Sequence, residues 1–108
     1  MPNLIYLATP YTKYPGGHQK AFELACKTAA RFLSEGYCVF SPIAHSHPIA
    51  QHMAQHHVWD HDLWMRLDAP MLAACDMMIV VTADGWRESR GIMHEIEEFS
   101  KTGKPLFY

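Results

Sequence analysis

Glu95 is the residue best placed to perform chemistry, because its spacing puts a carboxyl group at the edge of an apolar helix face. It lies one turn beyond Gly91, among the residues that mark the inner face of a predicted helix: Ile92, Ile96 and Phe99. A carboxyl group held there is expected to be partly buried. A solvated glutamate on an exposed helix face is the alternative interpretation.

Two further side chains could assist such a carboxylate. Tyr6 lies inside a short apolar strand, where a buried phenol needs a polar partner, and an active-site carboxylate is one candidate. Asp68 lies on a predicted helix and reaches the same site only if Pro70 bends that helix. Asp76, at the amino end of a strand, is expected to lie away from the ligand.

The segment from Ser89 to Ile96 begins a predicted helix on the ligand side. A helix N-terminus offers unpaired N–H groups and the positive end of the helix dipole to an anion. Ser89 could cap this helix, and Gly91 would let a ligand approach the backbone closely. Both are also ordinary residues for a helix start, so a phosphate site and a plain helix cap both stay open.

A histidine-rich segment suggests either a metal site or a set of ligand contacts. Six histidines and two aspartates lie in it: His45, His47, His52, His56, His57, His61, Asp60 and Asp62. Imidazole and carboxylate are zinc ligands, but this spacing matches no closed structural site. We therefore expect no metal, and interpret His45 and His47 as substrate-binding residues, together with Thr9 and Tyr11 in an earlier loop.

These residues must be positioned by strands that alternate with helices. Short apolar runs predict four strands: Leu4–Ala8, Tyr37–Phe40, Met77–Val81 and Leu106–Tyr108. Helical spacing predicts three helices: roughly Gly17 to Glu35, Asp60 to Ala74 with a kink or division at Pro70, and a last helix that ends near Gly103.

The stretch from Ile43 to Trp59 is irregular and broken by proline, at Pro42 and Pro48. We interpret it as a long loop with one helical turn near Gln51 to His56. Loops of this length in a small domain are usually functional.

This alternation predicts an α/β fold: an open doubly wound parallel sheet of about four strands with flanking helices, flavodoxin-like or Rossmann-like, in the order 2-1-3-4. Residues 1–108 form one domain. Ligands of such sheets bind outside the carboxyl ends of the strands. The loops Thr9 to His18, Ser41 to His61 and Thr82 to Ser89 should therefore form a site for a nucleotide-like ligand.

Composition excludes several other classes of protein. About half of the 108 residues are apolar and the net charge is −2 without a run of like sign, so we expect no duplex nucleic acid as partner. Three cysteines without CxxC spacing predict reduced thiols. The absence of a leader pattern and of a long apolar stretch predicts a cytoplasmic protein with no membrane partner.

At the level of short motifs the chain resembles the nucleoside 2-deoxyribosyltransferase-like superfamily, and within it the DUF1937 branch. The resemblance rests on Ile5 to Tyr11, Ala74-Cys75-Asp76, Ser89-x-Gly91-x-x-x-Glu95 and Gly103-Lys104-Pro105, and for the branch on the Ser-Pro-Ile-Ala-His-Ser-His segment. It covers nearly the whole chain and is most specific around Ser89 to Glu95.

The resemblance implies a role for each candidate. The glutamate matching Glu95 attacks the anomeric carbon of a 2-deoxyribosyl group, and the aspartate matching Asp68 assists the departing base. The tyrosine matching Tyr6 orients the nucleophile, and Ser89 and Gly91 match residues that hold a 5′-phosphate in nucleotide-hydrolysing relatives.

Three functions remain open on the sequence. The first is cleavage or transfer of the N-glycosidic bond of a nucleoside or nucleotide, without a cofactor. The second is a non-catalytic nucleotide-binding or sensing module, and the third a metal-dependent hydrolase that uses the histidine segment. A homo-oligomer is expected, because apolar helix residues such as Trp59, Trp64 and Met65 would need to be covered.

Overall fold

The strands pair in the order β2-β1-β3-β4, and every pairing is parallel. The computed structural model describes residues 3–54 and 60–108. The strands are β1 (Leu4–Ala8), β2 (Cys38–Phe40), β3 (Met77–Val80) and β4 (Leu106–Phe107). The predicted parallel sheet and its strand order are therefore confirmed, with strand ends that differ by at most one residue.

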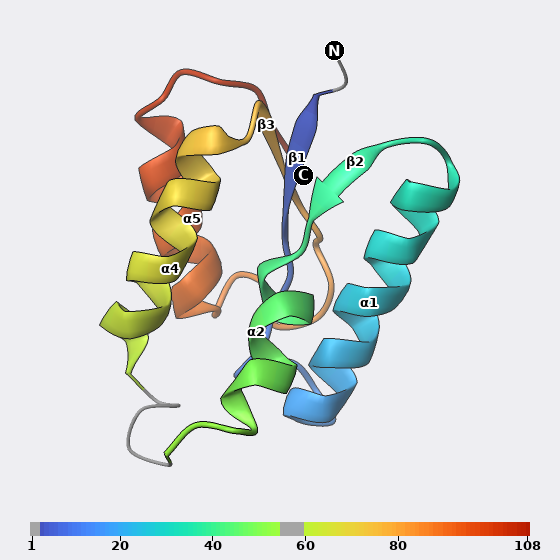
Figure 1. Ribbon diagram of the computed structural model, residues 1–108, viewed down its shortest axis with the longest axis vertical. Coiled ribbons are helices and arrows are strands. Elements are labelled where there is room, and N and C mark those ends of the chain that lie inside the picture. The colour runs from blue at the N-terminus through green and yellow to red at the C-terminus, as the bar shows by residue number, and fades with distance from the viewer. Residues whose placement is uncertain (1–2, 55–59) are drawn as a thin grey trace.

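Helices cover both faces of this sheet. They are α1 (His18–Ser34), α2 (Pro42–Ala50), α4 (His61–Ala74) and α5 (Arg90–Ser100). Figure 1 shows α4 and α5 together on one face and α1 on the other, with α2 at the end of the sheet where β1 and β2 finish. This is the doubly wound α/β arrangement that the sequence predicts.

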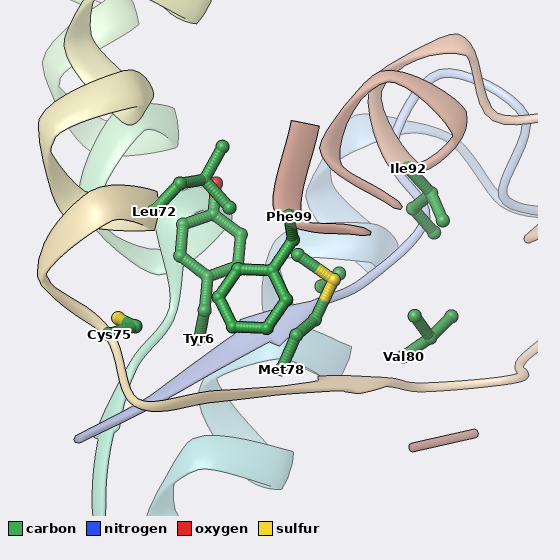
Figure 2. Close-up of a cluster of buried hydrophobic side chains, with 8 residues drawn as sticks. Tyr6, Leu72, Cys75, Met78, Val80, Ile92 and Phe99 are labelled. Atoms are coloured by element: carbon green, nitrogen blue, oxygen red, sulfur yellow. The ribbon is translucent and has the colours of Figure 1, made fainter. Parts of the chain in front are cut away.

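Successive residues of β1 point to opposite faces of the sheet and so contribute to the core on both sides. Tyr6 and Ala8 join a cluster on the side of α4 and α5, which Figure 2 shows around Phe99, Met78 and Leu72. Successive strand residues point to opposite faces, so the buried Ile5 and Leu7 face α1, where Ala21 and Ala25 are also buried. Burial on both faces explains why β1 is an unbroken apolar run.

The predicted long loop from Ile43 to Trp59 is wrong in its first half, which forms α2. Ser41 caps this helix, because its hydroxyl accepts a hydrogen bond from the Ala44 N–H at 3.2 Å. Pro42 then occupies the first helical turn, where a missing N–H has no cost, so it begins a helix instead of ending one. Gln51 and His52 form a turn after α2, and the rest of the predicted turn, near His56, lies outside the described residues.

The predicted division at Pro70 is also wrong, since α4 continues from His61 to Ala74. Proline lacks the N–H that would bond to the carbonyl of residue 66, and its ring crowds the same carbonyl, so that this carbonyl needs another partner. Arg66 is exposed, so water can bind that carbonyl. Asp76 behaves as predicted: its side chain accepts from the Leu4 N–H at 2.7 Å, at the amino end of the sheet.

The loops at the other end of the sheet hold each other in place. Gly85, with φ +86°, packs so closely on the carbonyl of Lys13 that a Cβ at this position would collide with that backbone. The loops after β3 and β1 are thereby joined. Within residues 3–54 and 60–108, no helix is long and apolar enough to cross a membrane.

Candidate active site

A pocket of about 460 Å³ opens at the carboxyl ends of the strands. Its size is typical of small-molecule sites. It lies where the predicted loops meet, and its lining includes Thr9, Tyr11, His47, Asp68, Ser89 and Glu95. The structure thus brings most of the predicted site residues to one cavity.

Glu95 reaches this pocket from the second turn of α5, and it is 5% exposed. Behind it, the fully buried Tyr6 donates a hydrogen bond from its hydroxyl to Glu95 Oε2. Burial, followed by the nearby charges of Glu95 and Asp68, raises the pKa of Tyr6 far above its usual range. Tyr6 therefore keeps its proton and fixes one oxygen of Glu95.

Asp68 supplies a second buried carboxyl group, from α4. It is 5% exposed, and among the described residues its Oδ1 atom has no hydrogen-bond partner. Buried polar atoms in proteins are nearly always paired, so this oxygen is available to a ligand. The side chain reaches the pocket from a helix that continues through Pro70.

The two carboxyl groups hold a proton between them at neutral pH. Burial raises the pKa of Glu95 to about 8, an effect that the Tyr6 hydrogen bond opposes and the charge of Asp68 reinforces. Burial raises the pKa of Asp68 to about 6, again opposed by Tyr6. Near pH 7 the pair therefore carries one carboxylate and one carboxylic acid. Because the two groups interact, the two steps of proton loss are properties of the pair.

The start of α5 forms a polar rim beside these acids. Ser89, Arg90 and Gly91 all line the pocket. The Ser89 hydroxyl caps the helix by accepting from the Ile92 N–H at 3.2 Å, as predicted. The first N–H groups of a helix have no partner inside it, so this end of the pocket favours an anionic group.

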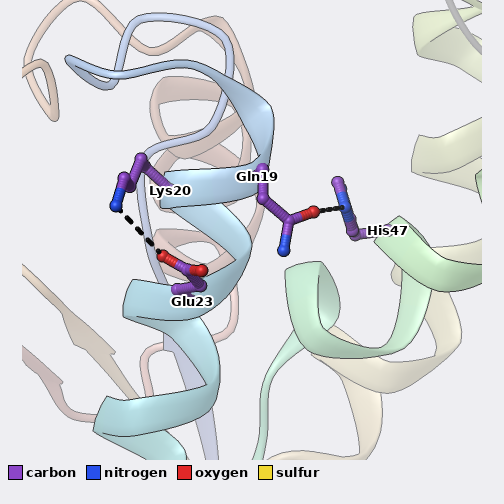
Figure 3. A network of polar contacts seen from close by, with 4 residues as sticks. All are labelled: Gln19, Lys20, Glu23 and His47. Carbon is purple, nitrogen blue, oxygen red and sulfur yellow. Dashed lines mark hydrogen bonds and ion pairs between the residues drawn. The ribbon is translucent and has the colours of Figure 1, made fainter.

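The opposite wall of the pocket is built around His47 of α2. Its Nδ1 lies 2.7 Å from the Tyr11 hydroxyl, and its Nε2 lies 3.3 Å from Gln19 Oε1. Burial and the charge of His18 lower the pKa of His47, so the imidazole is held neutral. Figure 3 shows the Gln19 contact crossing from α1 to α2.

The structure does not bring His45 into the pocket. It is exposed on α2 and its ring contacts Phe40, with 5.9 Å between the centroids. His45 and His47 are two residues apart in a helix and therefore point in different directions. The prediction of two adjacent ligand contacts assumed a loop, and the helix separates them.

The metal hypothesis gains no geometry from the part of the chain that the structure describes. Within residues 3–54 and 60–108, no three His, Cys, Asp or Glu side chains group as metal ligands do. His56 and His57, together with Trp59 from the predicted oligomer surface, lie outside the described residues.

Sequence reasoning missed one wall of the pocket, on α4. Trp64 and Met65 line it, in addition to the place that the sequence predicts for them on the apolar surface covered in a homo-oligomer. The signal was present, because Trp64 and His61 lie four and seven residues before Asp68, on the same helix face.

Comparisons with known proteins identify the family of the chain. No curated protein matches the chain. The family model described as a domain of unknown function, DUF1937, matches residues 3–108, which includes every residue of the site. The chain therefore belongs to the DUF1937 family.

Proposed function

We propose that this pocket cleaves or transfers the N-glycosidic bond of a nucleoside or nucleotide, with Glu95 as the nucleophile. The observation that carries the proposal is the buried pair of Glu95 and Asp68, which share a pocket and hold one proton at neutral pH. The resemblance to the nucleoside 2-deoxyribosyltransferase-like superfamily supports the same assignment of the two acids.

Such a pair suits the two requirements of N-glycosidic cleavage. One carboxylate must attack the anomeric carbon, and one acid must protonate the departing base. Tyr6 holds Glu95 by one oxygen, which leaves the other available for attack. Asp68 has an unpaired oxygen within the same cavity, from which a proton can reach the base.

The proposed reaction has two steps. The reaction starts from the form of the pair in which the shared proton lies on Asp68, which is the minor form because Glu95 has the higher pKa. In the first step, an oxygen of Glu95 forms a bond to the anomeric carbon while the carbon–nitrogen bond breaks, and this proton moves from Asp68 to the base nitrogen. In the second, water or another base attacks the same carbon, the bond to Glu95 breaks and the carboxylate returns. Asp68, now ionised, takes the proton of the incoming nucleophile.

The ends of the pocket suggest how a substrate lies. The start of α5, with Ser89 and Gly91 and with Arg90 beside them, would receive a 5′-hydroxyl or 5′-phosphate. The wall formed by Thr9, Tyr11 and His47 would then face the base, with the sugar between the walls and next to Glu95.

The test is release of free base from a panel of nucleosides and nucleotides, with wild type and two variants. Glu95→Gln keeps the size of the side chain and its bond to Tyr6 but removes the nucleophile, and should reduce kcat by roughly a thousandfold or more. Glu97→Gln makes the same change on the exposed face of α5 and should leave base release unaltered. Mass spectrometry after reaction with a slow substrate analogue should find the sugar attached to Glu95.

Equal base release by wild type and Glu95→Gln would exclude Glu95 as nucleophile. Tight binding of nucleotides without base release, by wild type as well, would instead favour a sensing module. Base release that a chelator abolishes and zinc restores would favour the metal-dependent hydrolase.

A further inference from the structure

The lining of the pocket contains a buried hydroxyl group that lacks a hydrogen-bond partner among the described residues. Thr9 follows β1 directly, is 3% exposed and lines the pocket. Among the described residues, nothing makes a hydrogen bond to its Oγ1 atom. A buried hydroxyl without a bond is costly, so this atom points to a ligand that supplies one.

Tyr11, two residues after Thr9 in the chain, also lines the pocket and is held in a fixed position. Its ring stacks on His18, with 4.3 Å between centroids and 8° between the planes, and its hydroxyl meets His47. His47 is itself held by Phe22 of α1, with ring centroids 4.5 Å apart. The direction of the Tyr11 hydroxyl is therefore set before any ligand arrives.

The proton of the Tyr11 hydroxyl can be assigned from its neighbours. A phenol is a stronger hydrogen-bond donor than acceptor, and an imidazole nitrogen is a good acceptor, so at 2.7 Å we assign donation from Tyr11 to Nδ1 of His47. The Nε2–H of the neutral ring then donates to Gln19 Oε1 at 3.3 Å, and the Gln51 amide, which lies 3.3 Å from the same Nε2, is assigned with its oxygen toward the ring so that it also accepts. Because the Tyr11 hydroxyl donates its proton to His47, its oxygen can act only as a hydrogen-bond acceptor toward the pocket.

We propose that Thr9 and Tyr11 select a nucleobase with an exocyclic amino group, and that His47 acts as a positioning residue for Tyr11. The amino group donates to the Tyr11 oxygen, and the Thr9 hydroxyl donates to the ring nitrogen next to it. A base with an oxo group in the same place presents an acceptor to an acceptor, which is repulsive. This inference takes the pocket as a nucleoside site and so rests on the proposed function.

The test compares pairs of free bases that differ in this one group: cytosine with uracil, and adenine with hypoxanthine. Calorimetry should show wild type binding the amino member of at least one pair roughly tenfold more tightly or better. Binding is measured without turnover, so it tests base selection even if no base is released from nucleosides. Equal affinity within both pairs, or no binding of any base, overturns the inference.

Variants then assign the preference to residues. Tyr11→Phe keeps the stack on His18 and removes the acceptor, so the preference should fall to within about threefold. His47→Phe keeps the stack on Phe22 and frees the Tyr11 proton, so it should lower the preference more than the overall affinity. Tyr14→Phe, outside this pocket, is the matched control.

Thr9→Val tests the unpaired hydroxyl separately. It should weaken binding of the amino base several-fold, while the unliganded protein becomes no less stable because no internal hydrogen bond is lost. Unchanged affinity in Thr9→Val would remove Thr9 from the selection. An unchanged preference in Tyr11→Phe would refute the role of Tyr11 and, with it, that of His47.

Discussion

Replacement of Glu95 by glutamine should make the protein more stable, and more so as the pH rises. The pKa of Glu95 is about 8 in the folded protein, against 4.5 for an ordinary glutamate, because the side chain is buried. The folded state thus holds this proton more tightly than the unfolded state does. Stability from this group is complete below about pH 4.5 and is lost as the pH rises toward 8.

The magnitude follows from the two pKa values. Each pH unit between them changes the free energy of unfolding by about 1.4 kcal/mol, so the full cost of ionising Glu95 is roughly 5 kcal/mol. Between about pH 6.5 and pH 8 the cost is roughly 2 kcal/mol. Glutamine does not titrate and still accepts from Tyr6, so Glu95→Gln should gain about this much over wild type across that range.

The assay is urea denaturation of both proteins at several pH values in this range. Asp68 has a pKa of about 6 and is mostly ionised throughout, and burial lowers the pKa of His47 from its ordinary value. Taking the difference between the two proteins removes the contribution of His47, and the contribution of Asp68 is small because this residue is mostly ionised across the range. Glu97→Gln controls for the loss of a carboxylate from an exposed position of α5. A stability difference that does not change with pH would show that Glu95 is ionised throughout, and would refute the shared proton.

The same geometry leads to four further predictions. The rate constant kcat/KM for base release should be bell-shaped, with limbs near pH 6 and pH 8, because only the singly protonated pair has both a nucleophile and an acid; a flat profile across this range would contradict it. Asp68→Asn should slow substrates with poor leaving groups more than those with good ones, and equal losses would give Asp68 a role in positioning alone. Ser89→Ala should lower the free energy of unfolding by about 1 kcal/mol, measured by denaturation, because it removes the cap of α5; no loss would show that the bond to Ile92 contributes nothing. Light scattering should find a homo-oligomer at micromolar concentration, and a monomer would refute the prediction made from apolar helix residues.

Much of the fold could be predicted because it depends on local patterns. The unbroken apolar runs of β1 and β3 and the helix spacing of α1 and α5 specify which segments form each element, and the right-handed crossover then leaves few sheet orders. The inward position of Glu95 follows from the same periodicity. Even the cap at Ser89 is a local property, since it depends only on the residues that begin α5.

Local sequence rules gave the wrong structure after Pro42, because a proline is compatible both with the end of a strand and with the first turn of a helix. Pro42 follows a strand and also begins α2; the cap at Ser41 is a local signal for the helix, and the packing of α2 on α1 holds the helix in place. That helix then turns His47 into the pocket and His45 toward solvent. No spacing rule applied to a presumed loop could have separated the two histidines.

The chemistry of the site was decided by tertiary structure. The sequence by itself could list Tyr6, Asp68 and Glu95 as candidates, because residue type and periodicity are visible in it. Tyr6, Asp68 and Glu95 lie 27 to 89 residues apart in the chain, and folding brings them together in one buried place. This arrangement decides whether Asp68 reaches the site and how far the pKa of each carboxyl group moves. Burial raises the pKa of a carboxyl group only when neighbours from other elements exclude water, and that exclusion exists only in the folded protein.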